Sequence, residues 1–223
     1  MQRIDKKVDK IVSAKYKAWV EKLEAEAKEH PHSYRYYYDD VAMNLYKCQK
    51  GVCAYTEMFI CVPELYVEKN WVNGRHKIQS DSAFKRNDHF GELEHFDPLL
   101  KKDKYWLWSN LFMIHSSVNS IKRDNPVVQY LKPDLDDYSP EKYFDYDEIT
   151  HRFIPGVDIE NEQIRNEIQI MIDQVLCLNH GVVQKERRDF VNLIKQRIQN
   201  NQPYVVDRFF TAVAFCLPLA IRN

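Results

Sequence analysis

Hydrophobic residues recur every three or four positions in several parts of the chain, which is the pattern of helices with one buried face. Residues 4–28 show this spacing first, with Lys and Glu between the apolar positions. The spacing predicts an amphipathic helix over 4–28 that Pro31 ends. A second short helix is predicted over 40–49, with Lys50-Gly51 as its C-terminal stop.

The same helical spacing returns in the last third of the chain. It predicts helices over 164–175 and 190–198. A further apolar helix is predicted over 206–217, and we expect it to bury itself against the others. Both ends of the chain are therefore expected to be helical.

The middle of the chain is richer in β-prone residues. Short runs at 52–55 and 59–62 predict strands, and Asn73-Gly74 is a hairpin signal. By contrast, residues 134–148 hold many Asp and Glu against the single Lys142. We interpret this acidic stretch as a solvated linker that cannot itself face DNA.

Composition limits the class of protein. Lys and Arg number 32 against 33 Asp and Glu, a net charge of −1, so no global basic field indicates a nucleic-acid binder. Hydrophobic content of 44% and aromatic content of 13% exclude a disordered chain. No stretch approaches the roughly 20 apolar residues that span a bilayer. Residues 1–10 are charged and lack the apolar segment of a signal peptide, so we expect a soluble, cytoplasmic protein without membrane contact.

The five cysteines fit a reducing compartment rather than a set of disulfides, since their number is odd. No two of them are spaced as Cys-x-x-Cys. A zinc finger therefore cannot be built from cysteines alone.

Residues 91–122 carry the candidate chemistry. A β-prone run ends in the pair Glu94-His95, a Lys-rich loop follows, and a second β-prone run over 105–114 leads to Ser116 or Ser117, either of which can cap a helix containing Asn119. Carboxylate and amide oxygens suit a hard cation such as Mg²⁺. A neighbouring His that titrates near neutrality suits a general base for activating water.

Four motifs stand in order around this segment. They are Gly51-Val52-Cys53-Ala54-Tyr55-Thr56-Glu57, Glu94-His95-Phe96-Asp97-Pro98, Trp108-Ser109-Asn110-Leu111 and His115-Ser116-Ser117-Val118-Asn119-Ser120-Ile121-Lys122. Together they resemble the HNH (ββα-metal) endonuclease family, and most closely the HNH proteins of Septu and retron-associated anti-phage defence systems. The resemblance spans roughly residues 40–195. It includes Cys177-Leu178-Asn179 and Arg187-Arg188, where such proteins tend to have a Leu-Asn helix followed by an Arg.

The resemblance implies an α+β fold in which a ββα-metal core hairpin and helix is wrapped by N- and C-terminal α-helices. It divides the chain into an N-terminal helical region (1–50), an HNH nuclease core (51–130) and a C-terminal helical region (131–223), packed as one compact domain. The implied function is metal-dependent hydrolysis of DNA phosphodiester bonds, as the nuclease effector of a defence system acting with an ATPase partner.

The resemblance also assigns roles to individual residues. His95 is the general base, and Glu94 and Asn119 hold one Mg²⁺ or Mn²⁺. Asn110 bridges backbone groups of the loop and holds His95 in place, which counts it among the catalytic residues. Candidate phosphate contacts are Lys101, Lys102, Lys104, Lys122 and Arg123.

The chain departs from the family at its zinc-binding cysteines. Thr56 and Val118 replace two of them and His115 replaces a third, so that only Cys53 is kept and Cys61 is a conceivable further ligand. Structural zinc sites need four N or S ligands, which Thr and Val cannot supply. We therefore expect no structural zinc.

Two other interpretations remain open. In the first, the protein is a catalytically inactive HNH-like scaffold that serves as a protein or nucleic-acid interaction module. Retention of the acid, the His and both Asn side chains argues against it. In the second, the protein is an unrelated helical protein with a chance motif, which predicts no hairpin near residues 91–115.

Overall fold

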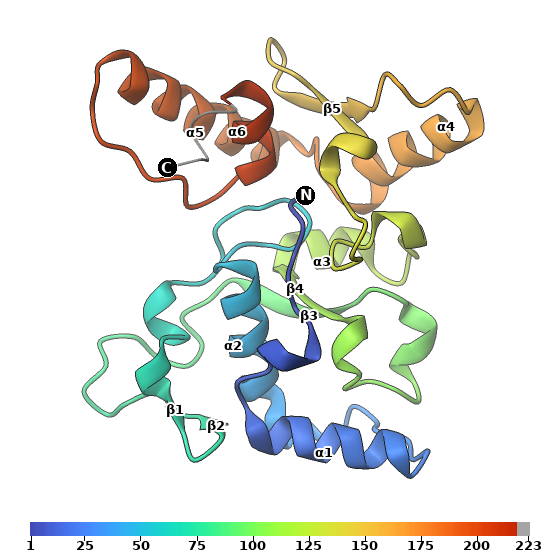
Figure 1. Cartoon of the computed structure of the whole chain (residues 1–223), viewed down its shortest axis with the longest axis vertical. Coiled ribbons are helices and arrows are strands. Elements are labelled where there is room, and N and C mark those ends of the chain that lie inside the picture. Colours follow the sequence, from blue (N-terminus) through green and yellow to red (C-terminus); the bar gives the residue numbers. More distant parts are fainter. Residues whose placement is uncertain (218–223) are drawn as a thin grey trace. The chain divides into compact units, whose positions relative to one another are not determined.

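The computed structural model describes residues 1–217 and has an α+β fold, as predicted (Figure 1). Every sheet among these residues is a two-stranded antiparallel ribbon. The chain forms two compact units. Unit 1 consists of Met1–Arg3, Ala54–Phe59 and Ser117–Asn223, and unit 2 of Ile4–Cys53 and Ile60–Ser116.

Unit 2 contains two helices and two hairpins. Buried aromatic and aliphatic side chains of these elements form its core. The elements are α1 (Ala14–Ala25), α2 (Tyr38–Gln49), β1 (Trp71–Val72), β2 (Arg75–His76), β3 (Gly91–His95) and β4 (Leu111–His115) (Figure 1). The unit joins residues of the predicted N-terminal region to the hairpin of the predicted nuclease core. Its boundaries therefore differ from the three predicted regions.

The first helix is shorter than the predicted helix over 4–28, which was wrong at its start. Only a 3₁₀ turn, Val8–Lys10, precedes α1. The hydroxyl of Ser13 accepts from the backbone N–H of Tyr16 and caps α1, so the helix begins at Ala14. The backbone N–H of Val12 is bonded instead by the side chain of Asn44. A local cap and a tertiary hydrogen bond therefore override the helical spacing before Ala14.

The predicted helix over 40–49 is confirmed as α2, and so is its stop. Lys50 and Gly51 have φ of 58° and 76°, and the N–H of Gly51 bonds to the carbonyl of Tyr46. Glycine is required here, because a Cβ at position 51 would lie 2.3 Å from the carbonyl oxygen of Cys61. The end of α2 is thus pressed against the segment that follows it.

The carboxylate of Asp40 ties the start of α2 to two other elements. It accepts from the hydroxyl of Ser13 (2.7 Å), the Nε of Arg75 (2.9 Å) and the backbone N–H of His76 (2.9 Å). The β1–β2 hairpin that carries Arg75 and His76 turns at Asn73-Gly74, as predicted, with φ of 51° and 72°.

The predicted strands over 52–55 and 59–62 are wrong. The two runs contain bridge residues but no strand, and in the second run Cys61 forms an isolated bridge with His89. The backbone N–H groups of Ile60 and Cys61 both donate to the carbonyl of Gly51. Because these donors converge on one turn, they cannot form the alternating ladder of a strand pair.

Unit 1 holds most of the remaining regular structure. Its elements are α3 (Ser116–Lys122, whose first residue belongs to unit 2), β5 (Phe144–Asp147), β6 (Arg152–Pro155), α4 (Glu162–Ile170), a π-helical turn (Met171–Val175), α5 (Gly181–Gln199) and α6 (Phe210–Cys216) (Figure 1). The three C-terminal helices lie where helical spacing predicts them. None of the described helices has the length and hydropathy needed to cross a membrane.

The prediction that 134–148 is a solvated linker is wrong. The stretch contains β5, which pairs with β6 from Phe144 opposite Pro155 to Asp147 opposite Arg152. Tyr138 and Phe144 are buried, and the Tyr138 hydroxyl donates to the carbonyl of Met1. Phe144 and Tyr146 alternate with Asp145 and Asp147 along β5, so that the aromatic and the acidic side chains lie on opposite faces of the strand.

Candidate active site on the β3–β4 hairpin

The hairpin predicted around residues 91–115 is present in unit 2. Strands β3 and β4 pair from Gly91 opposite His115 to His95 opposite Leu111. The N–H of Phe96 bonds to the carbonyl of Asn110 (2.9 Å), which extends the ladder by one step. The second strand is shorter than the predicted run over 105–114, because residues 108–110 form a 3₁₀ turn. A purely helical protein with a chance motif is excluded.

Gln49, the last residue of α2, binds the backbone of strand β4. Gln49 is fully buried, and its side-chain amide accepts from the N–H of Met113 (2.9 Å) and donates to the carbonyl of Met113 (2.7 Å). At the start of β3, a Cβ at Gly91 would lie 2.1 Å from the hydroxyl oxygen of Tyr46. The hairpin is therefore fixed against α2 at both strands.

Asn110 closes the loop between the two strands. Its side-chain oxygen accepts from the N–H of Asp97 (2.8 Å), and its side-chain nitrogen donates to the carbonyl of Asp97 (2.9 Å). The carboxylate of Asp97 in turn accepts from the N–H of Leu99 and caps the short turn Pro98–Lys101. Asn110 therefore bridges backbone groups of the loop directly after His95, the structural role predicted for it.

His95 is the last residue of β3, and its ring is held by the loop that follows. Its Nε2 lies 2.9 Å from the carbonyl oxygen of Tyr105, and the two ring centroids are 4.3 Å apart. A carbonyl oxygen can only accept a hydrogen bond, so Nε2 carries the proton. In the neutral ring Nδ1 is then the nitrogen with an acceptor lone pair, which is the state required of a general base.

Glu94 precedes His95 on β3 and is buried. Successive residues of a strand point to opposite faces, so Glu94 shares its face with its cross-strand partner Phe112. The Nζ of Lys6, a buried lysine, lies 4.5 Å from the centroid of the Phe112 ring and donates to the carbonyl of Trp108 (2.7 Å).

Asn119 lies in the middle of α3, in unit 1, and is half-buried. Helix α3 begins at Ser116, directly after β4 ends at His115, so the chain follows the order strand, loop, strand, helix. The backbone carbonyl of Asn119 accepts from the N–H of Arg123 (2.9 Å), which leaves the helix at φ 52°. Glu94 and His95 lie on β3 and Asn110 directly before β4 in unit 2, whereas Asn119 belongs to the helix that continues from the hairpin.

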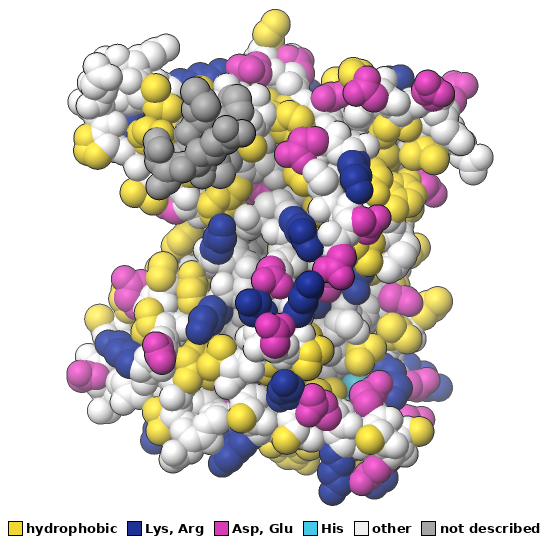
Figure 2. Space-filling view, viewed as in Figure 1, with side chains coloured by type: hydrophobic (Ala, Val, Ile, Leu, Met, Phe, Trp, Pro, Cys, Tyr) yellow, Lys and Arg dark blue, Asp and Glu magenta, His cyan; other side chains and the backbone are white. Residues whose placement is uncertain are grey.

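The five basic residues predicted to contact phosphates differ in exposure. Lys101, Lys102 and Arg123 are exposed. Lys104 is paired with the carboxylate of Glu24, with Nζ 2.5 Å from Oε1. Lys122 is fully buried, so it presents no exposed charge in this structure, and its phosphate contact stays a prediction. On the face shown in Figure 2, basic and acidic side chains are interspersed rather than separated by sign.

Four residues considered as zinc ligands, or standing in their place in the HNH pattern, are buried. Thr56 and Val118 are buried in unit 1, and Cys53 and Cys61 are buried in unit 2. Burial raises the pKa of the Cys61 thiol to about 12, and its Sγ lies 3.7 Å from the carbonyl oxygen of Val62. Within residues 1–217, no three His, Cys, Asp or Glu side chains form a group that could hold a metal ion.

Several contributors to the site gave no signal in the sequence. No local pattern reveals Gln49, Lys6 or His30, because each acts through a backbone or ring contact with a residue far along the chain. Compared with known proteins, the chain matches no family model and no curated protein.

Proposed function

We propose that this protein is a metal-dependent HNH endonuclease that hydrolyses DNA phosphodiester bonds. The observation that carries the proposal is the state of His95, whose Nε2 is bonded to the Tyr105 carbonyl at the end of a hairpin that runs directly into a helix. That order of elements supports a ββα-metal core. The acid, the imidazole and the two amides predicted for such a core stand at Glu94, His95, Asn110 and Asn119.

The donor set fits a hard divalent cation. Glu94 offers a carboxylate oxygen and Asn119 an amide oxygen, the ligand types that Mg²⁺ and Mn²⁺ prefer. When bound, such a cation supplies positive charge that stabilises the phosphoryl oxygens and the leaving 3′ oxygen.

Side chains of the protein accept the proton and position the groups that take part. Nδ1 of His95 accepts a proton from the attacking water, while the Tyr105 carbonyl keeps the ring in place. Asn110 fixes the backbone next to His95 through Asp97. Attack on phosphorus with loss of the 3′ oxygen leaves a 5′-phosphate and a 3′-hydroxyl.

We propose further that the chain acts as the effector of an anti-phage defence system with an ATPase partner. A net charge of −1 supplies little non-specific affinity for DNA, since phosphate contacts by cations provide most of it. Lys101, Lys102 and Arg123 are the exposed candidates for local contacts. We expect weak DNA binding by the isolated chain at physiological salt, and tight binding with a steep salt slope would contradict the need for a partner.

Plasmid cleavage across a Mg²⁺ and Mn²⁺ titration up to millimolar concentrations tests the metal site. Chelation with EDTA should abolish cleavage. Asn119→Ala and Glu94→Ala should reduce cleavage by weakening cation binding, so that raised metal recovers part of the activity, less in Glu94→Ala because a charged ligand is lost. Cleavage by the wild type that is indifferent to EDTA would contradict the proposal.

Elemental analysis of the same samples tests the expected lack of structural zinc. We expect no stoichiometric zinc, and circular dichroism should show that EDTA does not unfold the protein. One tightly held zinc per chain would overturn this expectation and would point to Cys53, Cys61 and His115 as ligands. A folded wild type that cleaves no DNA under any metal would favour the inactive scaffold instead.

A further inference from the structure

One peptide group joins His95 to a second histidine. The carbonyl of Tyr105 accepts from Nε2 of His95 (2.9 Å), and the N–H of the same peptide bond, that of Trp106, donates to Nδ1 of His30 (3.0 Å). Nε2 of His30 lies 2.8 Å from Oε1 of Glu24. A continuous chain of hydrogen bonds therefore runs from His95 through the peptide group and His30 to a carboxylate, entirely within unit 2.

The direction of every bond in this chain is determined. A backbone N–H can only donate, so Nδ1 of His30 accepts and its proton sits on Nε2, facing Glu24. Burial lowers the pKa of His30; the charges that face it act in opposite senses, Glu24 raising the pKa and Lys104 lowering it. The ring is therefore neutral, and each donor in the chain points away from His95 towards Glu24. Hydrogen bonds aligned in this way polarise one another.

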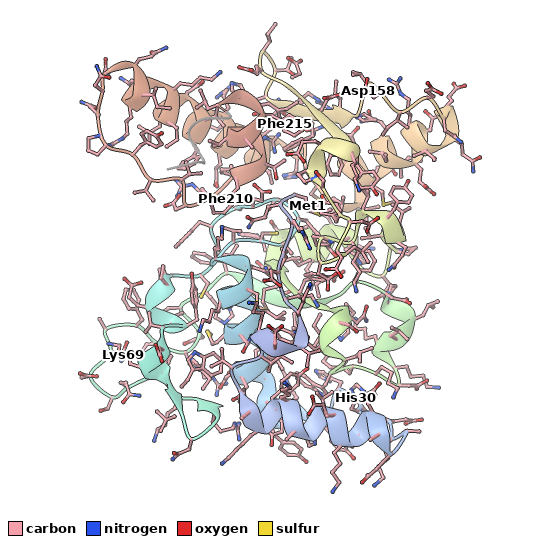
Figure 3. The ribbon with its side chains drawn as sticks, in the orientation of Figure 1. Met1, His30, Lys69, Asp158, Phe210 and Phe215 are labelled. Atoms are coloured by element: carbon pink, nitrogen blue, oxygen red, sulfur yellow. The ribbon has the colours of Figure 1, made fainter. Side chains whose placement is uncertain are left out.

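The middle of this hydrogen-bond chain, at Trp106 and His30, is held firmly by other contacts. Trp106 is fully buried, its Nε1 donates to the carbonyl of Pro31 (3.1 Å), and its own carbonyl accepts from the hydroxyl of Tyr16 (2.7 Å). The side chain of His30 is fully buried just beyond the end of α1 (Figure 3), and its backbone N–H donates to the carbonyl of Asp103 (3.0 Å). The peptide group is therefore fixed independently of His95.

The far end of this hydrogen-bond chain, at Glu24, is held by an ion pair. Oε1 of Glu24 also accepts from Nζ of Lys104 (2.5 Å). Glu24 lies on α1 with its side chain 38% exposed, and Lys104 belongs to the loop that follows β3. The ion pair ties that loop to α1 one residue before Tyr105, whose carbonyl binds His95.

We propose that His30 and Glu24 are positioning residues, which act through the Tyr105–Trp106 peptide to keep the proton of neutral His95 on Nε2 and its acceptor lone pair on Nδ1. The catalytic use of this arrangement rests on the proposed nuclease function. The arrangement itself does not depend on it, because the tautomer of His95 is a property of the folded protein. A supporting residue of this kind orients a reactive imidazole much as an outer-shell group orients a metal-bound one.

The first experiment measures the tautomers directly. In ¹⁵N-histidine-labelled protein at neutral pH, two-bond ¹H–¹⁵N spectra should show both His95 and His30 with the proton on Nε2. His30→Leu removes the acceptor of the Trp106 N–H and keeps an apolar side chain of similar size. We expect its Trp106 amide proton to move upfield and His95 to become a mixture of tautomers. In folded His30→Leu, an unchanged His95 spectrum would overturn the proposal.

Two further variants keep the test decisive if His30→Leu fails to fold. His30→Asn places a side-chain oxygen near the position of Nδ1 and should restore both the Trp106 amide shift and the Nε2 tautomer of His95. Glu24→Gln removes the terminal charge from a partly exposed position, which should preserve folding. The Trp106 amide proton should then move in the same direction as in His30→Leu. Glu21→Gln, at an exposed position of the same helix, is the matched control and should change neither signal.

Cleavage kinetics separate this proposal from the proposed function. We expect His30→Leu to lower kcat on the order of 10-fold with KM unchanged, and His30→Asn to recover most of the loss. Tautomer changes without any loss of kcat would overturn the positioning role. A wild type that cleaves no DNA would remove the nuclease function, while the His95 spectrum of His30→Leu would still decide whether the hydrogen-bond chain fixes the tautomer.

Discussion

In each of the hairpins β3–β4 and β5–β6, the amide of an asparagine brackets one backbone residue, accepting from its N–H and donating to its carbonyl. Asn110 does this to Asp97 with bonds of 2.8 and 2.9 Å, and Asn179 does it to Phe153 with bonds of 2.9 and 2.8 Å. Each hairpin also carries an acid and a histidine.

The two hairpins differ in what these acids and histidines bind. In β5–β6 the carboxylate of Asp147 accepts from the N–H of Ile149 and the hydroxyl of Thr150, so it caps its own turn. Nδ1 of His151 lies 2.9 Å from the hydroxyl of Tyr146. In β3–β4 the corresponding contact of His95 is made by Nε2, to a carbonyl.

The histidines of the two hairpins therefore have different partners: Nδ1 of His151 lies against a side-chain hydroxyl, whereas Nε2 of His95 lies against a backbone carbonyl.

The β5–β6 hairpin should depend strongly on Arg187. This guanidinium is buried, donates to the carbonyls of Leu178 (2.7 Å) and His151 (2.6 Å), and lies 4.8 Å from the Phe153 ring. Arg187→Ala should cost about 3 kcal/mol or more, because it leaves two buried carbonyls without donors. Urea unfolding followed by circular dichroism measures this.

The neighbouring exposed residue provides the control for that prediction. Arg188→Ala removes only a surface contact with Asp189 and should leave the urea midpoint at the wild-type value. Equal midpoints for the two variants would show that the buried guanidinium does not hold the hairpin together.

The two asparagines should separate stability from activity. Asn110→Ala and Asn179→Ala each remove two hydrogen bonds to a backbone residue, and each should cost about 1–3 kcal/mol. Only Asn110→Ala should also reduce DNA cleavage at temperatures well below unfolding, because only its loop holds His95. All four tryptophans lie in unit 2, so tryptophan fluorescence should register Asn110→Ala directly. Equal loss of cleavage in both variants would contradict the contrast.

The sequence predicts the local parts of this site and misses the distant ones. The β-prone run that ends in Glu94-His95, the turn at Asn73-Gly74 and the stop after α2 are local signals, and each is present in the structure. The contact between Trp106 and His30 joins residues 76 positions apart, so no local pattern reveals it. The acidic stretch was misread because its charge hides the alternating aromatic residues that pack inward.

Acid should destabilise unit 2 through three histidines, the buried His30 and the half-buried His76 and His89. Burial lowers the pKa of His30, His76 and His89 below the ordinary value of 6.5. The unfolded chain then binds more protons than the folded one once the pH falls below about 6.5. Stability should be constant above that pH and should be lost as the pH falls from there towards the lowered values.

The urea midpoint from tryptophan fluorescence at pH 7.5 and pH 5.5 measures this effect. It should be lower at pH 5.5, and His89→Gln should reduce the difference, because the ring that bonds the Tyr46 hydroxyl is then replaced by an amide that does not titrate. A midpoint that rises on acidification would contradict the conclusion that these three histidine rings are neutral in the folded protein.

The most direct test of the central claim is plasmid cleavage by His95→Ala beside His151→Ala, with circular dichroism confirming that both variants are folded. Loss of a positioned general base should lower the rate of His95→Ala by about 10²–10⁴-fold, without recovery at raised Mg²⁺ or Mn²⁺. His151→Ala should cleave at the wild-type rate, because its ring serves only its own hairpin. Unchanged cleavage by folded His95→Ala would contradict the account.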